Sequence, residues 1–317
     1  MLTLLLALGM LIVGTLLLVL GADWFLDGAE DLALSLGVSA LVLGVVLAGV
    51  EPEEMLTAAI ASARGAPTLA VGNVVGTNVT IITVALGLSA LITPMIIAPG
   101  VRRQALIATL VSIIPIVLLF LGVVTQLEGI LLLIVFVGYT VFLFRTDREA
   151  MKRMTEHDDD DELEQRERTR FHWKPLLLTI GGLAAMAVGG PAIVEGALQL
   201  AQVAGLSQGA VGATIVSLGT GAEMIALGVN AARKRQSDIL VGGILGSFAY
   251  NLLVTLGLAA AIRPIPVDPH VTFIALPIMV LVHLVLLASV WYGKIPRVMG
   301  GLLMGLYIAY LLGVVLA

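Results

Sequence analysis

The sequence predicts an all-α membrane protein with ten transmembrane helices arranged as two inverted five-helix repeats. Three observations support this prediction. Of the 317 residues, 59% are hydrophobic and only 12% are charged, whereas a soluble domain carries about twice that share of charge. The apolar residues fall into ten long runs, and the second half of the chain resembles the first at a fixed offset. Lipid must therefore cover most of the molecular surface.

Each apolar run is long enough to form a membrane-spanning helix, which needs roughly 20 apolar residues. The first run has neither the basic start nor the cleavage site of a signal peptide, so we interpret it as a full span. The predicted spans are residues 2–21, 35–62, 69–92, 104–122, 128–145, 175–198, 205–232, 239–262, 271–290 and 298–316.

The composition excludes several classes of function. So little charge is incompatible with a soluble enzyme, a nucleic-acid-binding protein or a disordered scaffold. The absence of cysteine excludes disulfides, thiolate metal sites and cysteine nucleophiles. No glycine-rich phosphate loop precedes a helix, so we expect no nucleotide. We therefore expect neither a cofactor nor an enzymatic reaction, and the first predicted partner is membrane lipid.

A strongly charged segment, residues 146–174, separates the first five spans from the last five and contains an acidic run at 158–162. If this segment is a cytoplasmic loop, 15 of the 17 Lys and Arg residues fall on the cytoplasmic side, in agreement with the positive-inside rule. We therefore predict a first repeat (1–145), a solvated cytoplasmic loop (146–174) and a second repeat (175–317). The expected location is the inner or plasma membrane of a bacterium or archaeon.

The two halves align without a gap at an offset of 170 residues. The aligned pairs include Gly49 with Gly219, Glu53 with Glu223, Gly72 with Gly242, Gly76 with Gly246, Thr77 with Ser247, and Pro94 with Pro264. Because each half contains an odd number of spans, the two copies must cross the membrane in opposite directions, as in many secondary transporters. The similarity is concentrated in residues 37–98 and 207–268.

Three carboxylates, Glu51, Glu53 and Glu54, lie near the middle of the second predicted span. A charge at this depth costs a few kcal/mol or more, and Pro52 interrupts the helix beside them. Carbonyl groups freed at such a break are tolerated only next to a polar cavity, and with carboxylates they are the oxygen ligands that Ca²⁺ prefers. Glu223 is the matching acid of the seventh span. We predict that these acids hold a cation between the repeats; protonated packing glutamates are the alternative.

Hydroxyl and amide side chains lie near these carboxylates. Thr220 is in the seventh span, Asn73 and Thr77 share one face of the third span, and Ser247 and Asn251 share one face of the eighth. We predict that these side chains complete the cation shell. Hydrogen bonding between closely packed, glycine-rich helices is the alternative interpretation.

At these residues the sequence resembles the calcium/cation antiporter superfamily, whose best-known members are the sodium–calcium exchangers. That family has ten spans in two inverted halves, and each half carries an α-repeat with the motifs G-T-S-x-P-E and G-N-x-x-G-S-N. Residues 49–54 and 72–78 stand in those places in the first half, and residues 219–224 and 242–248 in the second. The resemblance implies alternating-access exchange of Ca²⁺ for Na⁺ or H⁺.

Both motifs depart from the family pattern. The family's ion-binding glutamate aligns with Glu54 in the first repeat but with Met224 in the second, while Glu53 and Glu223 take the place of the motif's proline. Proton–calcium exchangers of the superfamily carry their acid one residue earlier, which fits Glu53 and Glu223. A hydroxyl implied for sodium ligation is replaced by Val50. These departures leave open which glutamate is the principal ligand and which counter-ion is used.

The sequence thus predicts a secondary antiporter that exchanges a divalent cation, Ca²⁺, for Na⁺ or H⁺. Glu53, Glu54 and Glu223 would hold the ion together with Glu51 and the hydroxyl and amide groups. Two rivals remain: an exchanger of the same fold for another cation such as Mg²⁺ or Mn²⁺, and a cation channel or non-transporting membrane protein.

Overall fold

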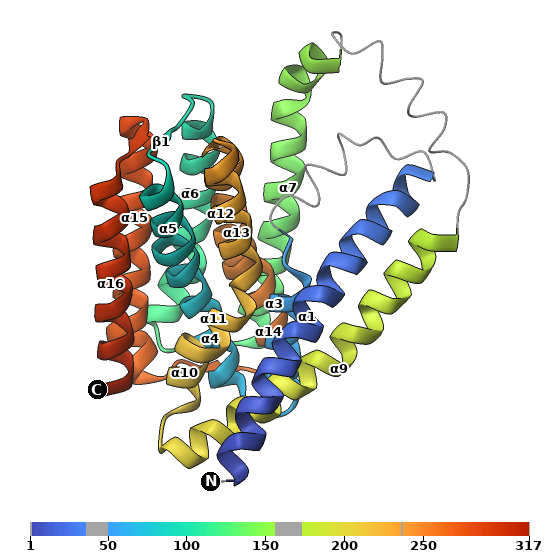
Figure 1. Cartoon of the computed structure of the whole chain (residues 1–317), viewed down its shortest axis with the longest axis vertical. Coiled ribbons are helices and arrows are strands. Elements are labelled where there is room, and N and C mark those ends of the chain that lie inside the picture. Colours follow the sequence, from blue (N-terminus) through green and yellow to red (C-terminus); the bar gives the residue numbers. More distant parts are fainter. Residues whose placement is uncertain (1, 36–49, 156–172, 236, 317) are drawn as a thin grey trace.

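The computed structural model describes residues 2–35, 50–155, 173–235 and 237–316 (Figure 1). Three features of the sequence lie outside the described residues: the segment 36–49 of the second predicted span, which includes Gly49, residues 156–172 of the predicted loop, and the acidic run within that loop. Both ends of the chain lie at the same end of the molecule (Figure 1).

The regular elements of the described chain are helices and four two-residue strands, joined by short turns and loops. The helices of the first half are α1 (Leu2–Ser35), α3 (Pro52–Ala63), α4 (Pro67–Thr80), η1 (Ile81–Ala85), α5 (Leu86–Ile92), α6 (Val101–Phe120) and α7 (Gln126–Thr155). Those of the second half are α9 (Trp173–Ala204), α10 (Gln208–Val211), η2 (Gly212–Val216), α11 (Ser217–Thr220), α12 (Ala222–Lys234), α13 (Ser237–Tyr250), η3 (Asn251–Thr255), α14 (Leu256–Ile262), η4 (Val271–Ala275), α15 (Leu276–Tyr292) and α16 (Arg297–Leu316). The strands are β1 (Met95–Ile96), β2 (Val123–Val124), β3 (Ile265–Pro266) and β4 (Lys294–Ile295).

Eight helices of the described chain are long and apolar enough to cross a membrane, and the bent pair Gln208–Thr220 and Ala222–Lys234 makes a ninth span. These nine match nine of the ten predicted spans. The tenth prediction, 35–62, is described only from residue 50, where it contains α3. The prediction of an all-α membrane protein is confirmed.

Three helices extend well beyond the predicted spans, and one of them is α9, which continues to Ala204 past the predicted end at residue 198. α1 continues to Ser35, so Asp23, Asp27 and Asp31, which follow the predicted span 2–21, lie on a helix and not in a loop. Packing against α9 explains the extension, because Gly28 lies directly against the backbone of Thr179. α7 likewise continues to Thr155, past the predicted start of the charged loop.

Equivalent elements of the two halves begin 170 residues apart, as the alignment predicts. α3 and α12 begin at Pro52 and Ala222, and the π-helices η1 and η3 begin at Ile81 and Asn251. The same offset relates α4 to α13 and α5 to α14. Local backbone geometry therefore repeats as well as sequence, including the rare π-helical turn, which is often found at functional sites.

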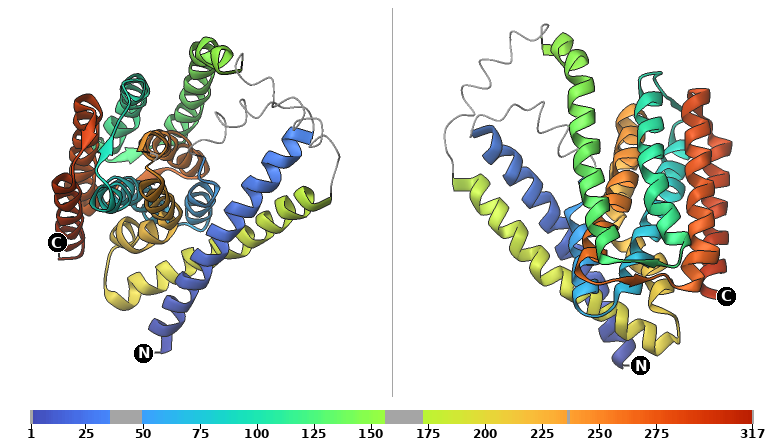
Figure 2. Two further views of the ribbon diagram at one scale, coloured as in Figure 1. Left: turned by 45° about the horizontal axis from the view of Figure 1, so that its top comes forward. Right: turned by 180° about the vertical axis from the view of Figure 1, so that it is seen from behind.

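α1 and α9 form an antiparallel pair that lies to one side of the other helices (Figure 2). Gly14 lies against Gly189, and Gly21 lies against Gly182, so residue numbers rise along one helix as they fall along the other. These glycines allow the two backbones to approach closely. Since α1 and α9 are equivalent elements of the two halves, their opposite directions show that the halves are inverted.

The two halves are interleaved. β1 pairs with β4, with Met95 opposite Ile295, and β2 pairs with β3, with Val124 opposite Ile265. Each strand therefore pairs with a strand from the other half. Several helices also pack across the halves: α5 packs against α16, and α14 packs against α7.

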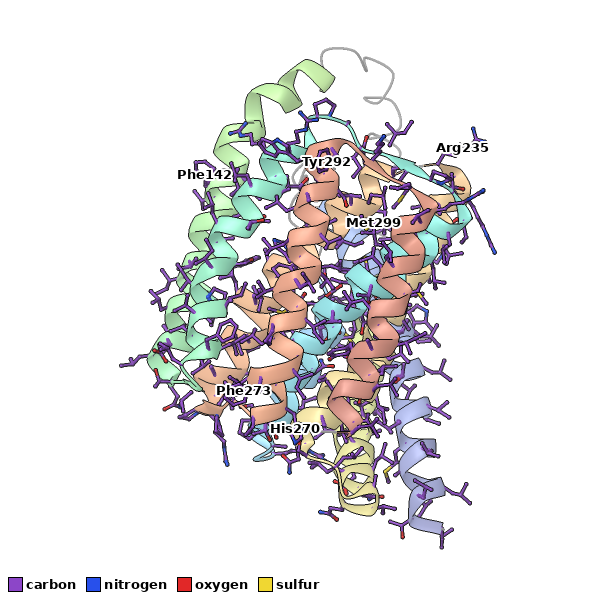
Figure 3. The ribbon with its side chains drawn as sticks, turned by 90° about the vertical axis from the view of Figure 1, so that its left-hand side faces the viewer. Phe142, Arg235, His270, Phe273, Tyr292 and Met299 are labelled. Atoms are coloured by element: carbon purple, nitrogen blue, oxygen red, sulfur yellow. The ribbon has the colours of Figure 1, made fainter. Side chains whose placement is uncertain are left out.

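The centre of the bundle is formed by α4 and α13, which are buried along most of their length. The outer helices α6, α7, α15 and α16 instead expose large apolar side chains, as expected for a surface in contact with lipid (Figure 3). Phe142 and Phe273 are 50% and 77% exposed on this outer face. Polar side chains at the centre are thus enclosed by protein and then by an apolar belt.

Candidate cation-binding site

The first half contributes three buried carboxylates at the start of α3. Glu51 is the N-cap residue, and Pro52 occupies the first helical turn, where its missing N–H leaves no hydrogen bond unmade. Glu53 and Glu54 follow in the same turn, and the three acids are 7%, 1% and 0% exposed. A helix N-terminus stabilises negative charge, so a helix that begins inside the membrane provides a favourable place for these carboxylates.

The second half contains a matching break. α11 ends at Thr220, Gly221 adopts φ −72° and ψ 2°, and α12 begins at Ala222. The helices on either side of the break are bent by 46°. Glu223 lies in the first turn of α12, the position that Glu53 holds in α3. Both halves therefore present a carboxylate at a helix start within the bundle.

Glu54 is surrounded by three of the predicted polar residues. The Thr77 hydroxyl donates a hydrogen bond of 2.8 Å to Glu54 Oε1, and the Asn73 amide donates to Glu54 Oε2. Thr220 of the second half donates to Asn73 Oδ1 at 3.3 Å. The Glu54 cluster thus joins α3, α4 and α11 and spans the interface between the halves.

Glu51 contacts the other two predicted polar residues. The Ser247 hydroxyl donates to Glu51 Oε1 at 2.7 Å, and the Asn251 amide donates to Glu51 Oε2 at 2.8 Å. Ser247 lies in α13, and Asn251 is the first residue of η3. In the Glu51 cluster, an acid of the first half is therefore held entirely by the second half.

Glu53 and Glu223 are neighbours across the interface between the halves, close enough for their carboxyl groups to interact. Because the two residues are equivalent in the repeat, they lie about the pseudo-two-fold axis that relates the halves, and we call them the axial pair. Within the described part of the chain, Glu53 Oε2 and Glu223 Oε2 are buried and have no hydrogen-bond partner. Two carboxylates this close repel each other unless a proton or a cation lies between them.

The structure therefore brings all nine predicted site residues into one region, arranged as two clusters with an acidic pair between them. In the part of the chain that the structure describes, no three acidic or histidine side chains converge on one point as metal ligands. A cation held here would need neutral oxygens as well as carboxylates, as is usual for Ca²⁺.

Two neighbouring polar residues were not among the predicted ligands. Asn78 of α4 is fully buried, and neither of its amide atoms has a partner within the described residues. Asp23 of α1 lies close enough for its charge to act on Glu223. The sequence could have indicated Asn78, because it lies in the second motif of the first half. Nothing in the sequence indicated Asp23, because it lies after the predicted first span.

Comparison with known proteins gives one consistent result. The sequence family described as "Sodium/calcium exchanger protein" matches residues 6–145 and 174–316. The chain is 31% identical to the inner membrane protein YrbG of Escherichia coli strain K12, covering 97% of this chain and 96% of that protein. It is 27% identical to the sodium/calcium exchanger MaX1 of Methanosarcina acetivorans, covering 95% and 96% of the two chains.

A solved structure shares the same fold. The sodium–calcium exchanger NCX_Mj, soaked with 10 mM Na⁺ and 10 mM Sr²⁺, superposes with a TM-score of 0.63 at 26% identity. The match covers 96% of this chain and 97% of that one. The similarity therefore extends over both halves and is not confined to the segments around the buried carboxylates.

Proposed function

Because the chain belongs to the sodium/calcium exchanger family, we propose that it is an antiporter exchanging Ca²⁺ for Na⁺ or H⁺ across the membrane. The family consists of exchangers, which places the chain among transporters and not enzymes. The relatives named as sodium/calcium exchangers support Ca²⁺ as the cargo.

The observation that carries this proposal is the set of acids inside the bundle at paired helix breaks. Glu51, Glu53 and Glu54 lie at the start of α3, and Glu223 lies at the start of α12. Hydroxyl and amide groups from both halves surround them. Uncompensated charge is costly within a membrane, so a site of this composition favours an ion as its missing partner.

Exchange follows if Ca²⁺ and the counter-ion compete for the same carboxylates. An empty site would carry several negative charges through a low-dielectric barrier, which is unfavourable. A site neutralised by Ca²⁺, Na⁺ or H⁺ has no such penalty, so only the occupied protein would change its access from one side to the other. The site would lie near the midplane between the inverted halves, as in other alternating-access transporters.

We also propose the orientation with the segment 146–174 in the cytoplasm and the repeat boundaries at 1–145 and 175–317. The support comes from basic residues that gather at one end of the bundle. Arg102 lies 5.9 Å from the ring of Trp291, and Arg297 donates to the carbonyl of Ile92. In Figure 3, Arg235 and Tyr292 lie at one end and His270 and Phe273 at the other. A basic end with interfacial aromatics fits the cytoplasmic side.

Ca²⁺ flux in proteoliposomes tests this function. An outward Na⁺ gradient and an outward H⁺ gradient are imposed in separate experiments. We expect one of them to drive Ca²⁺ uptake, and the gradient that does so identifies the counter-ion. Glu53→Gln and Glu223→Gln should each lower uptake about tenfold or more, because each removes one charge from the axial pair.

Four outcomes would contradict parts of this proposal. Flux without any counter-gradient would indicate a channel, and no flux of any cation under either gradient would indicate a non-transporting protein. Gradient-driven uptake of Mg²⁺ or Mn²⁺ but not Ca²⁺ would reject Ca²⁺ as the cargo. Normal Ca²⁺ flux in both glutamine variants would reject the axial pair as ligands.

Thr77→Val tests the neutral part of the site. Valine keeps the shape of threonine but removes the hydroxyl that donates to Glu54. We expect the Ca²⁺ concentration for half-maximal uptake to rise about tenfold, the effect of losing one hydrogen bond to a charged group. Thr83→Val is the matched control, because the equally buried Thr83 hydroxyl donates to the backbone carbonyl of Val79, four residues earlier in the chain. Equal effects of the two substitutions would contradict a specific role for Thr77.

A further inference from the structure

The internal repeat reveals that one acid is missing from the second half. Glu54 of α3 corresponds to Met224 of α12 at the 170-residue offset. Both residues are buried, and both follow the equivalent glutamates, Glu53 and Glu223. The second half therefore has a thioether at the position where the first half has the centre of the Glu54 cluster.

The partner of that acid has changed in the same way. Asn73, which donates to Glu54, corresponds to Gly243. A Cβ atom on Gly243 would lie 4.0 Å from Met224 Sδ, so Met224 packs against Gly243 just as Glu54 packs against Asn73. Acid and amide have thus both been lost at equivalent places.

The hydroxyl of the cluster has nevertheless been kept. Thr77 corresponds to Ser247, and the Ser247 hydroxyl donates to Glu51 and not to α12. Asn251, one turn later, supplies the amide. Each cluster therefore contains one carboxylate held by one hydroxyl and one amide that are four residues apart on a helix. In the Glu54 cluster the carboxylate, the hydroxyl and the amide come from the same half, whereas in the Glu51 cluster the hydroxyl and amide of the second half hold a carboxylate of the first.

We infer that Glu51 replaces the carboxylate that the second half lacks at Met224, so that the start of one helix, α3, supplies the carboxylates of both clusters. This inference rests on the proposed cation exchange and adds a role for Glu51. Its own counterpart in the repeat is Gly221, so the acid has no equivalent that could act in its place. Glu51 is then a ligand of the second half despite its position in the first.

A relocation experiment tests this role. Glu51→Ala should weaken the apparent Ca²⁺ affinity about tenfold or more, as expected for a lost charged ligand. Adding Met224→Glu and Gly243→Asn should recover most of that loss, because it rebuilds the first-half arrangement on α12. A Cβ on Gly243 would make only ordinary van der Waals contacts, the nearest with Leu227 Cδ2 at 3.7 Å. The control replaces Met224→Glu by Met224→Gln in the same background, which keeps the side-chain length without the charge.

The readouts are Ca²⁺ uptake in proteoliposomes and the rise in melting temperature that Ca²⁺ causes in the purified protein. Recovery with glutamate but not glutamine supports the inference. The inference is overturned if a folded triple variant shows no recovery, or if glutamate and glutamine at position 224 give equal recovery. Ca²⁺ uptake by the wild-type protein tests the proposed function separately.

If the triple variant does not fold, a double-mutant cycle decides instead. Glu51→Ala combined with Ser247→Ala should then weaken Ca²⁺ binding no more than Glu51→Ala alone, whereas independent, additive losses would overturn the inference.

Discussion

Replacing Glu54 with glutamine is expected to reduce Ca²⁺ exchange about a hundredfold, equivalent to about 3 kcal/mol. Both oxygens of Glu54 accept hydrogen bonds, one from Thr77 and one from Asn73. Glutamine removes the charge and turns one of the two acceptor oxygens into a donor, so the hydrogen bonds from Thr77 and Asn73 cannot both be kept as they are. The measurement is the initial rate of Ca²⁺ uptake in proteoliposomes across a range of Ca²⁺ concentrations.

Glu128→Gln is the matched control for this substitution. Glu128 lies in the first turn of α7 and contacts only the exposed Thr125 among the hydrogen bonds described. Its replacement should leave uptake unchanged. A Glu54→Gln protein that exchanges Ca²⁺ at the normal rate would remove the Glu54 cluster from the proposed site, whatever the result for the axial pair.

Replacing Gly76 with alanine is expected to cost about 2–3 kcal/mol of folding free energy, a large effect for a single methyl group. A Cβ atom on Gly76 would lie 2.6 Å from the Cα atom of Ala213, so α4 and η2 would have to move apart. Little movement is available, because the Tyr310 hydroxyl holds the Ala213 carbonyl at 2.5 Å. The free energy of unfolding, measured by denaturant titration in mixed micelles, tests this expectation.

Gly138→Ala provides the comparison for the same chemical change. Gly138 lies within α7, and a Cβ atom there would have no neighbour within 4 Å. Alanine favours a helix over glycine, so this variant should be as stable as the parent protein or slightly more stable. Equal destabilisation by the two substitutions would show that helix propensity, and not the close approach of α4 to η2, explains the effect.

Much of the fold could be predicted because lipid imposes simple requirements on a sequence. Long apolar runs located nine spans, and the 170-residue offset related elements such as α3 and α12 correctly. The residues at which the helices end were predicted less accurately. α1 continues through Asp23 and Asp27 because α9 packs beside it, and contact with a distant helix is not visible in local hydropathy.

The site could also be predicted only in part. The sequence was enough to select the residues that the structure brings together, from the acids in a membrane span, the hydroxyls and amides at helical spacing, and Pro52. Their pairing was not predictable. Glu53 and Glu54 are adjacent, but successive residues of a helix point about 100° apart, so one meets Glu223 and the other meets Thr77. The contact of Glu51 with Ser247 joins residues 196 positions apart, and only the packed structure reveals it.

The crossed strand pairs have a consequence for how such a fold can originate. β1 and β2 of the first half find their partners only in β4 and β3 of the second half. A polypeptide made of one half alone would leave both strand edges unpaired. It would gain partners only from a second copy inserted the other way up. An ancestral gene for one half would therefore have needed a product that inserts in both orientations, and duplication with fusion guarantees one copy of each orientation in every molecule.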